Sequence, residues 1–211
     1  MQKFISYFNE FLTLVSVVLP FIYFISFSKQ GKAYKIFTMY LFFIAIIQGV
    51  MYYLTSQNIP NLYLFQYYFI GQFIFLSLFY WQLLKTWMVL LVLGIILGAL
   101  GIQYFLSPSS FEAYNSIGVV VTQSVIVVYA MLYYYKMLSR KGSFLIINNG
   151  VFLYLIASVL FFSSGNLILK LGLKKETMRL IGIINDFSYF VLIVFILVEW
   201  WQNFRPKPIR K

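Results

Sequence analysis

The chain contains no cysteine and no histidine among its 211 residues. These two residue types supply the usual protein ligands of haem, zinc, copper and iron–sulfur clusters, so we expect no metal site and no redox cofactor. Their absence also excludes thiol nucleophiles and every catalytic arrangement in which a histidine activates a serine or a cysteine. We therefore predict no catalytic residue of these kinds.

Acidic residues are scarce as well, with five carboxylates against sixteen lysines and arginines. Any acid–base chemistry would have to use these five, which are Glu10, Glu112, Glu176, Asp186 and Glu199. A retinal Schiff base would need a lysine in the last apolar segment, and residues 180–203 contain none. A rhodopsin-like pigment is therefore excluded.

Apolar residues dominate the chain, at 62% against 10% charged residues. They form seven runs of about 18 to 25 residues, and about 20 helical residues suffice to cross a bilayer. A soluble fold of this size cannot hide so much apolar surface from water. We predict an all-α membrane protein in which residues 1–204 form one seven-helix transmembrane bundle and 205–211 form a short basic tail. The predicted spans are about 4–27, 36–55, 62–84, 86–106, 116–138, 144–169 and 180–203.

The basic residues lie at or beyond the ends of the spans, so the net charge of +11 indicates contact with anionic lipid headgroups and not with nucleic acid. Eleven lie in one set of loops and five in the other, and basic residues are retained on the cytoplasmic side during insertion. We therefore predict that the amino terminus lies outside and the carboxyl terminus in the cytoplasm. The segment from Lys170 to Arg179, with four basic residues, is the exception.

Tryptophan provides an independent indication of orientation, because indole rings favour the headgroup level. All four tryptophans fall at predicted cytoplasmic ends of spans, at Trp81, Trp87, Trp200 and Trp201.

Six polar residues fall in the outer half of the predicted spans, at Glu10, Gln48, Gln72, Gln123, Asn166 and Asp186. A carboxylate within a membrane is costly to expose to lipid, so it usually faces the bundle interior and often marks function. We predict that the six line one polar pocket open to the outside, with Glu10 and Asp186 facing a shared site. The alternative for the amides is hydrogen bonding between helices.

Helical periodicity places several polar residues on common faces. The face in the first span is bordered by Glu10 and consists of Ser6, Asn9, Thr13, Ser16 and Pro20. The face in the last span consists of Asn185, Tyr189, Leu192, Ile196 and Glu199. This second face connects the outer polar zone with the cytoplasmic end, and we expect it to transmit a change across the membrane.

The fourth span carries Gly94, Gly98 and Gly101 on one face. Such a ridge of small residues lets another helix approach closely. We expect it to pack within the bundle, and the alternative is that it forms a homodimer contact.

A constant offset relates two pairs of polar residues. Glu10 and Gln123 are 113 positions apart, and Gln72 and Asp186 are 114 apart. This offset pairs span one with five and span three with seven, as in transporters built from two parallel three-helix repeats and one connecting helix. The chain lacks the Pro-Gln pair of the sugar transporters of that type, since Phe21 follows Pro20.

The last third of the chain resembles a group of small bacterial seven-helix membrane proteins that occur alone or fused ahead of histidine kinases. The resemblance runs from the Asn148-Asn-Gly-Val-Phe-Leu-Tyr stretch to Ile184-Asn-Asp186 and consists mostly of aromatic and small residues. Where that group often has proline and then tryptophan, this chain has Asn149 and Phe152. The resemblance implies a sensor-like bundle in the bacterial cytoplasmic membrane that acts through a separate partner.

We therefore expect a non-enzymatic sensor-like bundle or an accessory subunit of a membrane complex, in contact with another membrane protein or a second copy. The first alternative is a small-solute transporter of the three-plus-one-plus-three type. The second is an intramembrane lipid-processing enzyme that uses Glu10 and Asp186 as its acid–base pair.

The charge distribution makes a direct prediction about topology. A reporter protein fused after Lys211 will show cytoplasmic activity, because eleven of the sixteen basic residues lie on the proposed inner side. Fusions of reporters that are active on only one side of the membrane measure this. Periplasmic activity of the Lys211 fusion contradicts the topology and the depth assigned to every polar residue.

Overall fold

The computed structural model describes residues 2–107, 115–138, 142–171 and 175–206. Over these residues the chain is helical and contains seven helices long and apolar enough to cross a membrane. Their bounds are α1 Gln2–Phe24, α2 Lys32–Ser56, α3 Leu64–Leu84, α4 Met88–Leu106, α6 Ser116–Met137, α7 Leu145–Leu171 and α8 Lys175–Glu199. A short 3-10 turn, η1 (Phe27–Lys29), follows α1, and a π-helical turn, η2 (Trp200–Phe204), follows α8. The predicted class, an all-helical bundle with seven apolar spans, agrees with this structure.

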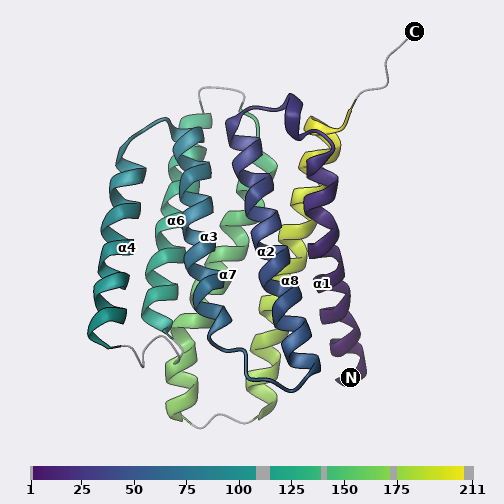
Figure 1. The fold of residues 1–211 in the computed structure, drawn as a ribbon, viewed down its shortest axis with the longest axis vertical. Helices are drawn as coiled ribbons and strands as arrows, with labels where there is room; N and C mark the ends of the chain where they lie inside the picture. Colours follow the sequence, from purple (N-terminus) through teal and green to yellow (C-terminus); the bar gives the residue numbers. More distant parts are fainter. Residues whose placement is uncertain (1, 108–114, 139–141, 172–174, 207–211) are drawn as a thin grey trace.

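Six of the helices contact one another in chain order around the bundle. The order is α1, α2, α3, α6, α7 and α8, and α8 closes the ring against α1. The remaining helix, α4, packs mainly on α3 at the edge of the bundle (Figure 1). The chain begins at one end of the bundle, which we call the N-end, and its last described residues lie at the opposite end, the C-end (Figure 1).

The hairpin of α7 and α8 is longer than the sequence indicated. A break was predicted from Lys170 to Arg179, whereas α7 continues to Leu171 and α8 begins at Lys175. The 27 residues of α7 span about 40 Å at 1.5 Å per residue, which exceeds a hydrocarbon core of about 30 Å. The paired ends of these helices project beyond the others at the N-end (Figure 1). The helix ends at Leu171 and Lys175 belong to the segment whose basic residues depart from the predicted cytoplasmic bias, and these ends extend past the bundle.

Aromatic side chains form the core near the C-end. The Phe204 ring lies 4.7 Å from the Tyr34 ring and 4.9 Å from the Phe144 ring, measured between centroids. The Phe79 ring meets the Phe144 ring edge-on, with centroids 5.3 Å apart. It is tilted against the Phe37 ring, with centroids 5.2 Å apart. These separations are in the range that aromatic pairs prefer. The cluster joins α2, α3, the start of α7 and η2.

The glycine ridge of α4 does not pack within the bundle, which corrects the expectation for Gly94, Gly98 and Gly101. All three are exposed, and a Cβ atom added at any of them meets no atom of the described structure within 4 Å. The reason is the position of α4 at the edge, where only one side of the helix faces α3. The ridge is on the outer side, together with Ile95 and Ile102.

One buried carboxylate connects the last two helices at the C-end. Glu199 is fully buried, and its Oε1 accepts hydrogen bonds from the Phe144 amide at 3.1 Å and the Asn203 side chain at 2.6 Å. Its Oε2 accepts from the amides of Ile146 at 3.0 Å and Ile147 at 3.3 Å. The first amides of a helix have no partner within that helix, so this carboxylate caps α7 from α8.

Tyr23 of α1 and Ser26, just before η1, hold the same end of α8. The hydroxyl of Tyr23 donates to the carbonyl of Ile196 at 2.8 Å, and the hydroxyl of Ser26 donates to the carbonyl of Phe204 at 2.8 Å. Such bonds are needed because the interior of a membrane bundle offers no water to satisfy backbone groups. The carboxyl end of α8 is therefore fixed to both α1 and α7.

The capping geometry predicts the effect of replacing Glu199. Glu199→Gln keeps the size of the side chain but turns an amide donor toward backbone amides that are themselves donors. We expect a loss of about 2 kcal/mol, or about 4 to 8 °C in Tm, in detergent-solubilised protein. The control is Glu10→Gln, the same replacement at an exposed position of α1. Equal Tm values for the two variants contradict the capping role.

Candidate functional site

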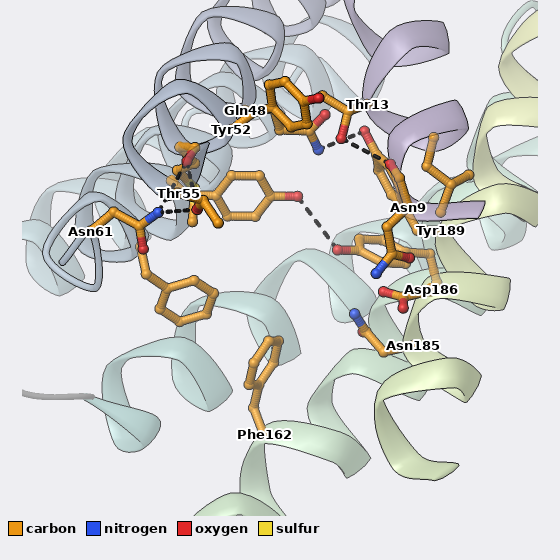
Figure 2. Close-up of a pocket in the computed structure, with 15 residues that line it drawn as sticks. Asn9, Thr13, Gln48, Tyr52, Thr55, Asn61, Phe162, Asn185, Asp186 and Tyr189 are labelled. Carbon is orange, nitrogen blue, oxygen red and sulfur yellow. Dashed lines mark hydrogen bonds between the residues drawn. The ribbon is translucent and has the colours of Figure 1, made fainter. Parts of the chain in front are cut away.

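A pocket of about 400 Å³ lies at the N-end between α1, α2, α3, α7 and α8 (Figure 2). Seven polar residues line it, namely Asn9, Thr13, Gln48, Thr55, Asn61, Asn185 and Asp186. Six aromatic residues line it as well, namely Tyr52, Phe65, Tyr68, Tyr154, Phe162 and Tyr189, and Leu12 and Met51 complete the wall. The combination of a largely aromatic wall with a few converging polar groups is typical of a small-molecule site.

Two of the six predicted polar residues, Gln48 and Asp186, lie in the wall of this pocket. The polar face predicted for the first span also turns toward it, since Asn9 and Thr13 are lining residues. Asn9, Asn185 and Asp186 gather on one side of the pocket, opposite the α2 residue Thr55 and Asn61 (Figure 2). The amide of Asn61 donates to the Thr55 hydroxyl at 2.7 Å and to the Met51 carbonyl at 3.0 Å, which holds that side in place.

The position of Glu10 corrects the prediction of a shared carboxylate site. Glu10 is exposed and is not a lining residue, whereas its neighbour Asn9 is. One residue along a helix turns the side chain by about 100°, so the inward position of Asn9 directs Glu10 away from the pocket. Asp186 is therefore the only carboxylate among the lining residues.

The other predicted amides do not join the pocket, which corrects the expectation for Gln72 and Gln123. Both are buried, and neither is a lining residue. Gln72 donates to the Tyr40 hydroxyl at 3.1 Å, a hydrogen bond from α3 to α2 of the kind expected for interhelical contacts. The side chain of Asn166 lies outside the described residues.

A chain of hydrogen bonds crosses from α2 through α8 to α1 beside the pocket. Ser16 donates its proton to the Leu12 carbonyl at 2.7 Å, so its oxygen accepts the Tyr189 proton at 2.9 Å. The Tyr189 oxygen then accepts from the Gln48 Nε2 group at 3.0 Å. This order fixes the orientation of the Gln48 amide and leaves its Oε1 buried without a hydrogen-bond partner among the described residues.

The carboxylate of Asp186 is half-buried and has no hydrogen bond or ion pair with the described part of the chain. Next to it in sequence, the Asn185 Oδ1 atom is buried and also lacks a hydrogen-bond partner there. Buried polar groups in proteins are normally paired, and an unpaired ionisable group in a membrane helix usually marks function. The α8 side of the pocket therefore holds acceptors that no described donor satisfies.

Aromatic rings form the remaining wall. The hydroxyls of Tyr68 and Tyr154 lie 3.4 Å apart, and the Tyr154 ring lies 5.5 Å from that of Tyr189. The rings of Phe65 and Phe162 are 5.2 Å apart. Except for Tyr189, the sequence pointed to none of these residues, because 22% of the chain is aromatic and nothing distinguishes the rings at the pocket from those in the core.

Packed side chains close the bundle between this pocket and the C-end. Moving toward the C-end along the lining helices, the next inward residues include Ile44, Phe73, Leu76 and Leu192, all buried in the core. A second hollow of about 570 Å³ lies at the C-end and shares no lining residue with the first. It is lined by Lys32 and Lys85 and by no acidic residue, so its charge is opposite to that of the N-end pocket.

Comparisons with protein-family models, with curated proteins and with solved structures gave no match to this chain.

Proposed function

We propose that this protein is a non-enzymatic sensor of the bacterial cytoplasmic membrane, or the ligand-binding subunit of a membrane complex. Its N-end faces outside and its C-end faces the cytoplasm, in agreement with the distribution of basic residues. The observation that carries the proposal is the pocket at the N-end, where Asp186 has no partner among the described residues and a packed core lies between the pocket and the C-end. A sensor needs a binding site on one side and no passage to the other.

The helix α8 provides the route from the pocket to the cytoplasmic side. It lines the pocket with Asp186 and Tyr189, continues through the buried residues Leu192 and Ile196, and ends at Glu199. A ligand that contacts Asp186 and shifts α8 therefore acts on the carboxylate that caps α7. An equilibrium between two positions of α8, biased by the ligand, is sufficient for signalling.

A transporter remains the alternative, and it requires alternating access of one site to both sides. The hollow at the C-end is the feature that favours this alternative. The buried residues between the two hollows, with Phe73 and Leu76 both about 1% exposed, favour the sensor. The enzyme hypothesis loses its proposed acid–base pair, because Glu10 is directed away from the pocket that contains Asp186.

The partner of such a sensor contacts the outer face of α4. Gly94 and Gly98 are four residues apart on this exposed face, and that spacing lets two membrane helices approach closely. The partner is a membrane helix of a signalling protein or of a second copy. The basic tail after Phe204 contacts anionic headgroups of the inner leaflet.

The absence of cysteine makes a clean accessibility experiment possible. We expect Thr55→Cys, in the pocket, to react with a membrane-impermeant maleimide applied from outside. Leu76→Cys and Ile44→Cys, in the packed layer, should react from neither side in the full chain. The measurement is labelling in intact spheroplasts and in inside-out vesicles.

Two controls define the outcome. The natural chain has no thiol and gives the blank, and Gln202→Cys, an exposed position at the C-end, should react only in inside-out vesicles. Reaction of Leu76→Cys or Ile44→Cys from the cytoplasmic side, while Thr55→Cys reacts from outside, identifies alternating access and overturns the sensor in favour of the transporter.

A further inference from the structure

We propose that the N-end pocket binds a small organic cation, an ammonium group attached to an apolar body. This inference rests on the proposed function, since it names the class of ligand that the sensor detects. It is carried by three features of the lining residues, which are their charge, the acceptors they leave unpaired and the number of aromatic rings.

The charge of the pocket is negative. Its fifteen lining residues include one carboxylate, Asp186, and no lysine or arginine. Two carbonyl oxygens of lining residues, Gln48 Oε1 in α2 and Asn185 Oδ1 in α8, also have no donor among the described residues, but both atoms are buried and the carboxylate is the group that sets the charge. Charges separated by low-dielectric surroundings interact more strongly than in water. An anionic ligand is therefore disfavoured, and a cation supplies the partner that Asp186 lacks within the described ranges of the chain.

The hydrogen-bond chain through Tyr189 strengthens this conclusion. Because Ser16 and Tyr189 have already used their protons, the Gln48 amide must donate to Tyr189 and keep its oxygen as an acceptor. Gln48 is thus held with its oxygen as an acceptor, whereas the Asn9 and Asn185 amides each carry an N–H donor as well as an acceptor oxygen. Among the lining groups the Asp186 carboxylate accepts only, so a ligand with an N–H donor matches it, whereas a ligand with acceptors alone does not.

Aromatic rings complete the site. Six of the fifteen lining residues are tyrosine or phenylalanine, with Tyr154 and Tyr189 packed ring to ring at 5.5 Å. The face of an aromatic ring attracts cations, and cages of such rings recognise organic ammonium groups in proteins. The rings also bury the apolar body of the ligand. A volume of about 400 Å³ is in the range of pockets for small organic molecules.

An inorganic cation fits the site less well. The described residues contain no group of three or more acidic side chains, histidines or cysteines that could hold a metal ion. Calcium takes six to eight oxygen ligands, and magnesium needs nearly octahedral geometry. The single carboxylate and the apolar rings of this pocket instead match a large and weakly hydrated cation.

Three probes of similar shape and different charge test the proposal. They are phenethylammonium, 3-phenylpropanol and 3-phenylpropionate, titrated into the full chain in lipid nanodiscs by calorimetry at about pH 7, where an aliphatic amine keeps its proton as lysine does. We expect phenethylammonium to bind most tightly and 3-phenylpropionate most weakly. Asp186→Asn should raise the Kd for phenethylammonium by about tenfold or more.

The control is Glu10→Gln, which removes a carboxylate from α1 in the same half of the bundle but outside the pocket. It should leave the Kd for phenethylammonium within about twofold, whereas general attraction to a negative surface would affect both variants equally. Tyr154→Phe, which keeps the ring, should retain binding, and Tyr154→Leu should weaken it. Each variant is tested for Tm, so that loss of fold is separated from loss of binding.

The outcomes separate this inference from the proposed function. Equal or tighter binding of 3-phenylpropanol, or binding of phenethylammonium that survives Asp186→Asn unchanged, overturns the cation site and leaves the sensor intact. No binding of any probe also overturns it. Cation binding together with alternating accessibility of the introduced cysteines upholds the site and overturns the sensor, because the protein would then carry the cation across.

Discussion

Four hydrogen bonds converge on the carboxylate of Glu199, and the arrangement of α7 and α8 depends on them. Three come from the amides at the start of α7, which would otherwise be buried without partners, and the fourth comes from Asn203 in the turn after α8. Each unpaired buried donor costs about 1–3 kcal/mol. Since neither lipid nor the packed aromatic cluster can satisfy these groups, the position of α8 at the C-end determines whether α7 is capped.

The two carboxylates of α8 contrast in their surroundings. Glu199 has every acceptor position occupied by a donor of the protein, whereas Asp186, 13 residues earlier, has none among the described residues. The first joins α7 to α8, and the second is the group to which we assign the ligand. Between them the helix is buried at Leu192, Ile193 and Ile196. One helix therefore links Asp186, which has no partner among the described residues, to Glu199, whose partners include the first amides of α7.

Much of the bundle follows from the sequence, because length and hydropathy are local properties. The seven spans agree with the helices within a few residues, apart from the extended hairpin of α7 and α8. The polar positions Gln48 and Asp186 lie in the pocket wall, as the sequence indicated. The side of the helix was not predictable for Glu10, which was assigned inward from the cost of exposing a carboxylate to lipid although the polar face runs through Asn9. Whether Gln72 and Gln123 line the pocket, and whether the α4 glycines are packed or exposed, depends on which helices are neighbours. The capping of α7 by Glu199 depends on the same arrangement. Such long-range contacts leave no signal in one sequence.

Coupling between the two ends of α8 is the central claim, and a fluorophore at the C-end tests it most directly. The single thiol of Gln202→Cys, at an exposed position, carries an environment-sensitive label while phenethylammonium is titrated. The account predicts an emission change with the same midpoint as binding, lost in Glu199→Gln although phenethylammonium still binds. An emission change that is unaffected by Glu199→Gln, or binding with no change at the label, contradicts the transmission of ligand binding through α8.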